Sequence, residues 1–537
     1  MNTASTSRLF VLFGFVWAAA ALPQGLAASP SEQQAVPARR RKIELNKNRF
    51  VLDGEPFLVK GMAYSPFYPG ESNRDKIVKA DVASDMRKMR ELGINTLLIY
   101  WTRSERIYKE ARRNELMILH GIWIEQEPAD FHEPRFKEGV KRQIRHAIDY
   151  VHNVEGEDYS DTILGFWIGG ELNPASVDGT DTRHPELTQF QGTYYQTRTG
   201  VTATECFLAE MCDYARGYAN EKYGHDFFFS HINWPPTEPW LKLDFLDFVM
   251  FDVYSFWPPE VVNFRKGSFA STSYQGYIEY LKDAYPAVPV VISEFGMSTA
   301  PDNVTTSGNS ERDQAAELIA RWHDIVTTEK PLAGGIVFEW NDEWWKQSGA
   351  AVLVPFDADK NHHERDDAEE WFGIVGIDGP SHADYRVRPK QAYHAVARMY
   401  APVFYADRRM VQPASVVPLY ESVSVVSLSA EGRPLDASRQ LHLCVAIREK
   451  SGTPNARIRL EAAGSMAEEG IVWGESLPLH RYAGAADADG WRKIVIPLEH
   501  FGPLDFSQLL SLSVIAEGAE ARPIIKDAAF SPNYCIE

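Results

Sequence analysis

The chain has 537 residues, more than one ordinary hydrophobic core organises, so its length predicts two or three domains. Hydrophobic residues make up 44% of the chain and charged residues 24%, which is typical of a globular protein. The formal net charge of -19 argues against nucleic acid as a partner, because phosphate binding needs a basic face.

Residues 1–28 predict a secretory signal peptide, with a retained membrane anchor as the alternative. Arg8 supplies the positive charge, residues 9–22 form the apolar run, and small residues around Ala27 and Ala28 suit cleavage. No later stretch approaches the ~20 apolar residues of a membrane span. We therefore expect a secreted or periplasmic protein with no membrane span after signal cleavage.

The four cysteines suit an oxidising compartment. Cys206 and Cys212 are close in sequence, while Cys444 and Cys535 flank the C-terminal region. Two local disulfides are the simplest expectation, although four cysteines permit three pairings.

Short apolar runs alternate with helical patterns between Ile43 and Pro402. They are continuously apolar, as strands buried on both faces should be. The runs span residues 57–64, 94–101, 117–125, 163–171, 226–234, 247–254, 288–296 and 333–340.

Amphipathic segments lie between these runs, and residues 74–93, 135–154 and 310–326 keep apolar side chains at helical spacing. Eight buried strands that alternate with helices predict an α/β fold, a (β/α)8 TIM barrel over residues 43–402. A doubly wound sheet is the alternative, but it usually carries a glycine-rich phosphate turn after its first strand, and none is seen.

After Pro402 the runs become short and alternating, with turns between them and few helical patterns. This pattern of short alternating runs predicts an all-β sandwich over residues 415–537. The stretch "GWRKIVIPLEHF" resembles carbohydrate-binding jelly rolls, in which the tryptophan, here Trp491, packs in the core. The sandwich is therefore interpreted as a sugar-binding module or a scaffold for the barrel.

Catalytic residues of a barrel lie at the C-terminal ends of its strands. The fourth run ends in Glu171 and the seventh carries Glu294 near its end, which puts two glutamates across the barrel axis from each other. Paired carboxylates suit glycoside cleavage, because one protonates the leaving oxygen while the other attacks the anomeric carbon. The expected mouth is acidic and aromatic and contains no lysine. Its other residues are Tyr64, Tyr100, Trp101, Glu125, His231, Asn233, Trp234, Asp252, Tyr254, Glu339 and Trp340.

A family resemblance rests on these strand ends. "GFWIGGELN" and "VISEFG" resemble the retaining β-glycosidases of glycoside hydrolase clan A, whose acid/base glutamate ends strand 4 and whose nucleophile ends strand 7. "FLVKGMAYSPF" and "DFVMFDVY" look like strands 1 and 6 of the family 2 barrels. "GGIVFEWNDEWW" and "FGIVGIDG" look like the end of family 2 and family 72 barrels. The resemblance covers residues 43–402 and implies an enzyme without a cofactor.

Carried over residue by residue, the resemblance implies Glu171 as acid/base, Glu294 as nucleophile and Tyr254 as the nucleophile's partner. It also implies Trp340 as a floor for the sugar. The usual asparagine before the acid/base is Gly170 here, so another residue must hold the sugar 2-hydroxyl. The candidates for this role are Asn173 and His231, and Tyr64 is a further substrate-binding candidate. Glu339 is interpreted as a structural ion-pair partner.

These features predict a retaining β-glycoside hydrolase or glucanosyltransferase that acts on an oligo- or polysaccharide, either a β-linked glucan or a related polymer. A non-catalytic polysaccharide-binding protein on a decayed barrel is the alternative, motivated by Gly170. A metal-dependent deacetylase or hydrolase is a third hypothesis, which the lack of a His/Asp ligand cluster argues against. The polar run at 357–370, with His362 and His363, is interpreted as a solvated loop rather than a metal site. The oligomeric state is left open.

Overall fold

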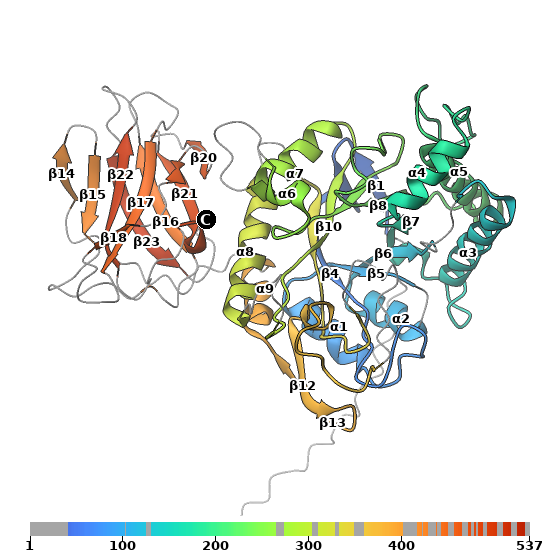
Figure 1. Ribbon diagram of the computed structural model, residues 1–537, viewed down its shortest axis with the longest axis horizontal. Coiled ribbons are helices and arrows are strands. Elements are labelled where there is room, and N and C mark those ends of the chain that lie inside the picture. Colours follow the sequence, from blue (N-terminus) through green and yellow to red (C-terminus); the bar gives the residue numbers. More distant parts are fainter. Residues whose placement is uncertain are drawn as a thin grey trace, which may run out of the picture. The chain divides into compact units, whose positions relative to one another are not determined.

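The eight predicted strands form a closed parallel barrel in the computed structural model (Figure 1). Each strand lies within one of the predicted apolar runs, so the TIM-barrel prediction is confirmed. The strands are β4 (Val59–Ala63), β5 (Thr96–Ile99), β6 (Met117–Ile122), β7 (Ile163–Gly170), β8 (Phe229–Asn233), β9 (Val249–Asp252), β10 (Val290–Phe295) and β11 (Gly334–Val337).

The structure describes the barrel part of the chain over residues 41–101, 104–124, 130–264, 273–302, 310–327, 332–347 and 359–400. In the C-terminal part it describes 416–420, 423–427, 437, 442–448, 456–463, 471–473, 477–479, 482–486, 491–501, 509–516 and 524–531. Predictions for residues 1–28, Glu125 and Cys535 therefore lie outside the described residues.

Helices surround the barrel strands (Figure 1). Helix α1 (Val82–Glu91) begins where the Asp81 side chain accepts a hydrogen bond from the Ser84 N–H at 3.1 Å, a normal N-terminal cap. Helix α5 (Ala203–Tyr223) begins with a capping box formed by Thr202 and Glu205. The other helices are α2 (Glu105–Arg113), α3 (Pro134–His152), α4 (Pro174–Arg183), α6 (Pro259–Val262), α7 (Ser273–Ala284), α8 (Glu311–Thr327) and α9 (Gln391–Tyr400).

A small antiparallel sheet precedes the barrel and was not predicted as a separate element. It contains β1 (Ile43–Asn46), β2 (Arg49–Leu52) and β3 (Glu55–Phe57). Phe50 on β2 is fully buried, and its ring meets Phe248 edge-on with centroids 5.2 Å apart. It belongs to the same apolar cluster as inward-facing barrel residues such as Trp167. The sheet therefore closes the barrel core.

The C-terminal part consists of antiparallel sheets, as the sequence predicted. One sheet has the order β14 (Val416–Tyr420), β15 (Val423–Ser427), β22 (Leu509–Ala516), β17 (Ala456–Ala463) and β18 (Ile471–Trp473), and β19 (Leu477–Pro478) also pairs with β17. The second has the order β20 (Ala483–Ala486), β21 (Arg492–Pro497), β16 (His442–Arg448) and β23 (Ile524–Ser531). Both sheets contribute to one apolar core that includes Leu443, Leu460, Ile494 and Leu512.

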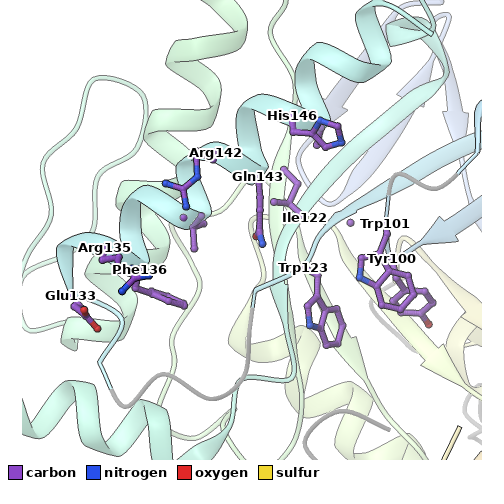
Figure 2. A pocket seen from close by; sticks show the side chains of 14 residues that line it. Tyr100, Trp101, Ile122, Trp123, Glu133, Arg135, Phe136, Arg142, Gln143 and His146 are labelled. Atoms are coloured by element: carbon purple, nitrogen blue, oxygen red, sulfur yellow. The ribbon is translucent and has the colours of Figure 1, made fainter. Parts of the chain in front are cut away.

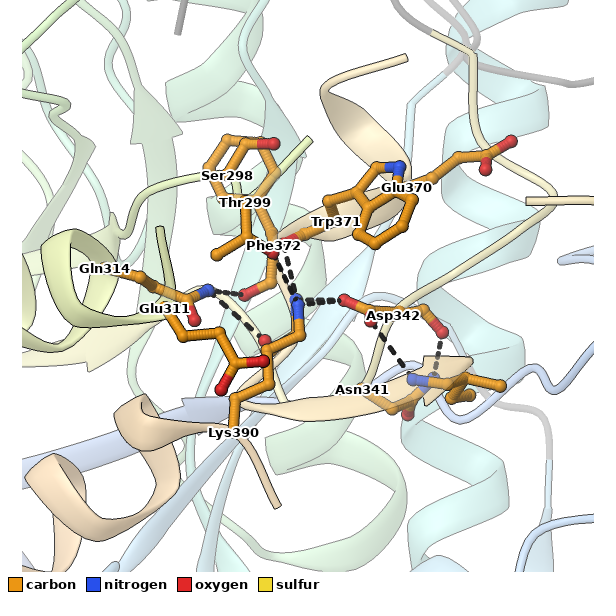
Figure 3. A network of polar contacts seen from close by, with 12 residues as sticks. Ser298, Thr299, Glu311, Gln314, Asn341, Asp342, Glu370, Trp371, Phe372 and Lys390 are labelled. Atoms are coloured by element: carbon orange, nitrogen blue, oxygen red, sulfur yellow. Dashed lines mark hydrogen bonds and ion pairs between the residues drawn. The ribbon is translucent and has the colours of Figure 1, made fainter. Parts of the chain in front are cut away.

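The segment after β11 is held by a buried ion pair (Figure 3). Lys390, which follows the hairpin of β12 (Val375–Ser381) and β13 (Asp384–Pro389), donates to Asp342 at 2.7 Å and to the Trp371 carbonyl at 3.1 Å. Gln314 on α8 donates to the Phe372 carbonyl at 3.0 Å. These bonds fix the short 3-10 helix η2 (Glu369–Trp371) at the barrel mouth.

The predicted local disulfide between Cys206 and Cys212 is wrong. Both are free, buried thiols on α5. They lie nearly two helical turns apart, which is too far for a disulfide. A bridge between Cys444 and Cys535 stays a prediction. In the part of the chain that the structure describes, no helix combines the length and the apolar character that crossing a membrane requires.

Candidate active site

Glu171 directly follows β7, at the C-terminal end of the barrel strands. Its φ of +46° is left-handed, which is uncommon for a residue with a side chain, and Gly169 has a φ of +71°. The Glu171 N–H donates to the Ile232 carbonyl of β8 at 3.0 Å and anchors this turn. Such backbone strain is typical of functional sites. A Cβ on Gly170 would lie 3.3 Å from the Trp167 ring, so packing leaves little room for the usual asparagine.

Two tyrosines hold the carboxyl group of Glu294 on β10. Tyr254 donates to Oε2 at 2.8 Å, and Tyr100 donates to Oε1 at 2.6 Å. The contact from Tyr254 is the one that the family resemblance implied. Tyr100 had been noted only as the end of its strand, because sequence spacing does not show which way a strand-end side chain turns. Glu294 itself is 9% exposed.

The two glutamates differ in their electrostatic surroundings. Burial, followed by the charges of Glu294 and Glu369, raises the pKa of Glu171 to about 8. Burial also raises the pKa of Glu294, but the hydrogen bonds from Tyr100 and Tyr254 oppose this rise by stabilising its ionised form. Among the described residues, none donates a hydrogen bond to the Glu171 carboxyl. Glu171 is therefore the better proton donor and Glu294 the better nucleophile.

Asp252 lies beside this pair, opposite Glu294 in the register of β9 and β10. The Ser293 hydroxyl donates to its Oδ1 at 2.7 Å. Burial, and then the charges of Glu294 and Glu171, raises the pKa of Asp252 well above its usual value.

The interpretation of residues 357–370 as a solvated loop is wrong for its C-terminal end. Glu370 and Asp367 are buried, and the His363 ring stacks on Trp371 with centroids 3.5 Å apart. Burial is the main cause that raises the pKa of Glu369 to about 7, and the charge of Glu294 raises it further. The charge of Glu369 also acts on Glu171. Sequence reasoning missed Glu369 because a polar run gives no sign of tertiary burial.

The prediction that the mouth contains no lysine is also wrong. Lys346 is 6% exposed, and its Nζ donates to Glu339 Oε1 at 2.7 Å and lies 3.0 Å from Glu343 Oε2. Its charge lowers the pKa of Glu294. Lys346 lies several residues beyond the eighth strand, so it is not among the strand-end residues from which the mouth was predicted. The ion pair of Glu339 is the structural role expected for that residue.

Trp340 does not take the place expected of a sugar floor. Its side chain is 1% exposed and packs beside Tyr393 of α9, with centroids 6.0 Å apart, so no face is open to a sugar. Tyr64 is 2% exposed, and its hydroxyl donates to Asp85 at 3.0 Å. The strand-8 ring beside Tyr254 is instead Phe338, at 6.4 Å. Residues two apart share one side of a regular strand, but β11 ends at Val337, so Phe338 and Trp340 lie beyond it and need not point the same way.

The two candidates for holding the sugar 2-hydroxyl have different surroundings. Asn173 caps α4, accepting from the Ala175 N–H at 2.9 Å, and stays partly exposed. His231 is fully buried, with Nδ1 2.9 Å from the Ile168 carbonyl, and burial lowers its pKa to about 4. It is therefore a neutral imidazole at physiological pH. Within the described ranges, no group of three or more His, Cys, Asp or Glu residues could hold a metal ion.

No protein-family model and no curated protein sequence matches the chain. Solved structures that resemble it include a GH2 β-galacturonidase from Eisenbergiella tayi bound to galacturonate, with 14% identity and a TM-score of 0.47. The match covers 68% of this chain and 54% of that one. The galacturonidase belongs to the family whose barrel motifs the sequence resembles.

Two β-glucuronidases are similar to the same extent. The enzyme from Ruminococcus gnavus in complex with uronic deoxynojirimycin has 12% identity and a TM-score of 0.45, over 67% of this chain and 52% of that one. The enzyme from Dictyoglomus thermophilum has 12% identity and a TM-score of 0.46, over 68% and 54%. The chain thus spans about half the length of these solved structures.

Proposed function

We propose that this protein is a retaining β-glycoside hydrolase, or a transglycosylase of the same mechanism, that acts on a β-linked glucan or a related polysaccharide. The observation that carries the proposal is the asymmetry of the two strand-end glutamates. Burial near other carboxyls favours a protonated Glu171, while two tyrosines favour an ionised Glu294. Double displacement needs one acid and one carboxylate in this arrangement.

In the first step, the Glu294 carboxylate attacks the anomeric carbon as the glycosidic C–O bond breaks. The Glu171 proton moves to the departing oxygen, which leaves a glycosyl ester on Glu294 and a carboxylate on Glu171. In the second step, Glu171 takes a proton from water, or from the hydroxyl of another sugar, whose oxygen attacks the anomeric carbon. The ester bond then breaks, and both glutamates return to their starting protonation states.

Azide rescue tests both assignments through the stereochemistry of the product. The substrates are dinitrophenyl β-glycosides of glucose, cellobiose, laminaribiose and glucuronic acid. In Glu294→Ala, azide attacks from the vacated side in one displacement, so an α-glycosyl azide is expected. In Glu171→Ala, Glu294 still forms the intermediate and azide replaces water, so a β-glycosyl azide is expected.

The two variants serve as controls for each other, because each removes one carboxyl from the same site. Full activity of Glu294→Ala without azide would remove Glu294 as nucleophile. The same anomer from both variants would contradict the division of roles. Failure of the unmodified protein to cleave any β-glycoside or β-glucan would favour the non-catalytic polysaccharide-binding alternative.

We also propose that the protein is exported by its N-terminal segment. The support is the charge, apolar run and small residues of positions 1–28. Mass spectrometry of the protein recovered from the periplasm or medium should find an N-terminus near Ala28 or Ser29. An intact N-terminus in the membrane fraction would favour the anchor.

A further inference from the structure

A cavity of about 910 Å³ lies between the ends of β5 and β6 and the first turns of α3 (Figure 2). Tyr100, which donates a hydrogen bond to Glu294, is one of its lining residues. Tyr100 therefore links the cavity lining to the surroundings of Glu294. Its volume is at the upper end of the ~300–1,000 Å³ that is usual for ligand sites.

The strand side of the cavity is aromatic. Trp101 and Trp123 line it together with Tyr100, and Figure 2 shows the three rings grouped on that side. The ring centroids of the two tryptophans are 6.0 Å apart, and both side chains are partly exposed. Flat apolar faces with a polar N–H at one end are suited to sugar rings, which present C–H groups on their faces and hydroxyls at their edges.

The helix side of the cavity is basic. Arg135, Arg142 and His146 of α3 line it with Gln143, and all four side chains are exposed. Positions 135, 142 and 146 are spaced by two turns and then one turn of helix, so they share a face. Figure 2 shows these labelled side chains along α3. Glu133, just before the helix, is the acidic residue of the lining.

The other basic residues of this helix already have acidic partners. Lys137 and Lys141 pair with Glu210 of α5, and Arg145 pairs with Glu138 at 2.9 Å. Within the described part of the chain, Arg135 and Arg142 make no ion pair, although the charge of Arg142 helps to lower the pKa of Glu138. Unpaired guanidinium groups beside an aromatic wall are therefore available to an anionic ligand, and the planar fork of arginine matches a carboxylate.

We propose that this cavity binds a carboxylated sugar residue of the glycan that the site cleaves, with the tryptophans under the ring and Arg135 and Arg142 on the carboxylate. The inference rests on the proposed function and narrows its substrate to acidic glycans. The net charge of -19 would otherwise repel an acidic polymer, so a local basic wall is needed to bring one to the mouth.

Affinity electrophoresis of the full chain tests the inference without requiring turnover. The gels contain carboxymethylcellulose or hydroxyethylcellulose, which share a β-linked glucan backbone and differ in charge. The carboxylated polymer should retard the protein more strongly. Arg142→Gln should weaken that retardation about tenfold or more, the usual effect of losing a charge-assisted hydrogen bond. Raising the salt concentration should also weaken the retardation by carboxymethylcellulose, because salt screens the interaction between charges.

Arg145→Gln is the matched control, because it removes the same charge from the same helix at a residue that binds Glu138 and Tyr214 and does not line the cavity. Equal weakening by Arg142→Gln and Arg145→Gln would overturn the inference, since net charge would then explain the binding. Equal retardation by the two polymers would overturn it in favour of neutral glucan binding. Retardation by dextran sulfate and not by carboxymethylcellulose would overturn the assignment to carboxylates.

The outcome is separable from that of the proposed function. Cleavage of β-glycosides without carboxylate-dependent retardation removes this inference alone. Retardation that depends on Arg142, in a protein that cleaves no β-glycoside, supports the binding site and removes the proposed activity.

Discussion

Replacing Tyr100 by Phe should move the acidic limb of the pH–activity profile upward. The Tyr100 hydroxyl donates to Glu294 Oε1 at 2.6 Å, and this bond favours the ionised carboxylate. Without it, the pKa of Glu294 rises, so the nucleophile of the proposed mechanism becomes protonated at a higher pH. Because only the carboxylate attacks the anomeric carbon, activity at low pH is lost first.

The size of the shift follows from the strength of the bond. A hydrogen bond to a charged group contributes about 1.5–3 kcal/mol. One pKa unit corresponds to about 1.36 kcal/mol, so the acidic limb should move up by about 1 to 2 pH units. The bond from Tyr254 at 2.8 Å remains, which keeps the variant active above the new limb. The alkaline limb, which the proposed mechanism assigns to Glu171 near pH 8, should stay in place. The bell-shaped pH profile should therefore become narrower.

The assay is kcat/KM against pH for the best dinitrophenyl glycoside of the panel. Tyr108→Phe is the matched control, because it removes a tyrosine hydroxyl that lies 2.7 Å from His120 Nε2 instead of a carboxylate. The control should leave both limbs unchanged. An acidic limb that stays fixed in Tyr100→Phe would refute the reasoning, even if total activity fell.

Three further predictions concern the acid, the buried ion pair and the tryptophan. Glu171→Gln should abolish the alkaline limb near pH 8 and lower kcat/KM by about 10²–10⁴-fold on glycosides with poor leaving groups; a limb that persists would assign it to another residue. Lys390→Met leaves the buried Asp342 carboxyl without its ion-pair partner, so the free energy of unfolding should fall by about 3–5 kcal/mol in thermal or urea denaturation, whereas Arg365→Met, at an exposed pair, should have little effect. Trp340→Phe should lower the melting temperature but keep kcat/KM within about threefold, because the ring is packed against Tyr393; a large loss of kcat/KM at unchanged melting temperature would restore it as a sugar floor.

The barrel could be predicted because its signal is local. Each strand is buried on both faces and therefore reads as an apolar run, and each helix shows its own spacing. The positions of Glu171 and Glu294 follow from the same rule, since a strand that is buried along its length is open only at its end. The antiparallel sheets of the C-terminal part follow from alternation in the same way.

The partners of those glutamates could not be predicted from spacing. Tyr254 follows β9, which pairs with β10, whereas Tyr100 follows β5, which is separated from β10 by β11 and β4. Only the closed barrel brings both hydroxyls to one carboxyl. Lys346 and Glu369 belong to polar stretches beyond the last strand, which look solvated until the fold buries them. Whether Phe338 or Trp340 lies beside Tyr254 depends on how the chain turns after β11 ends at Val337.

The sequence by itself determined the eight strands, their order and the two carboxyls at strand ends, because hydrophobic periodicity and strand direction are properties of neighbouring residues. Only the tertiary structure decided which carboxyl keeps its proton, since the pKa of each depends on burial and on charges and hydroxyls from distant segments. The same holds for the basic wall of the cavity: α3 carries several cations, and the fold decides that Glu138 and Glu210 neutralise some of them and leave Arg135 and Arg142 facing the cavity.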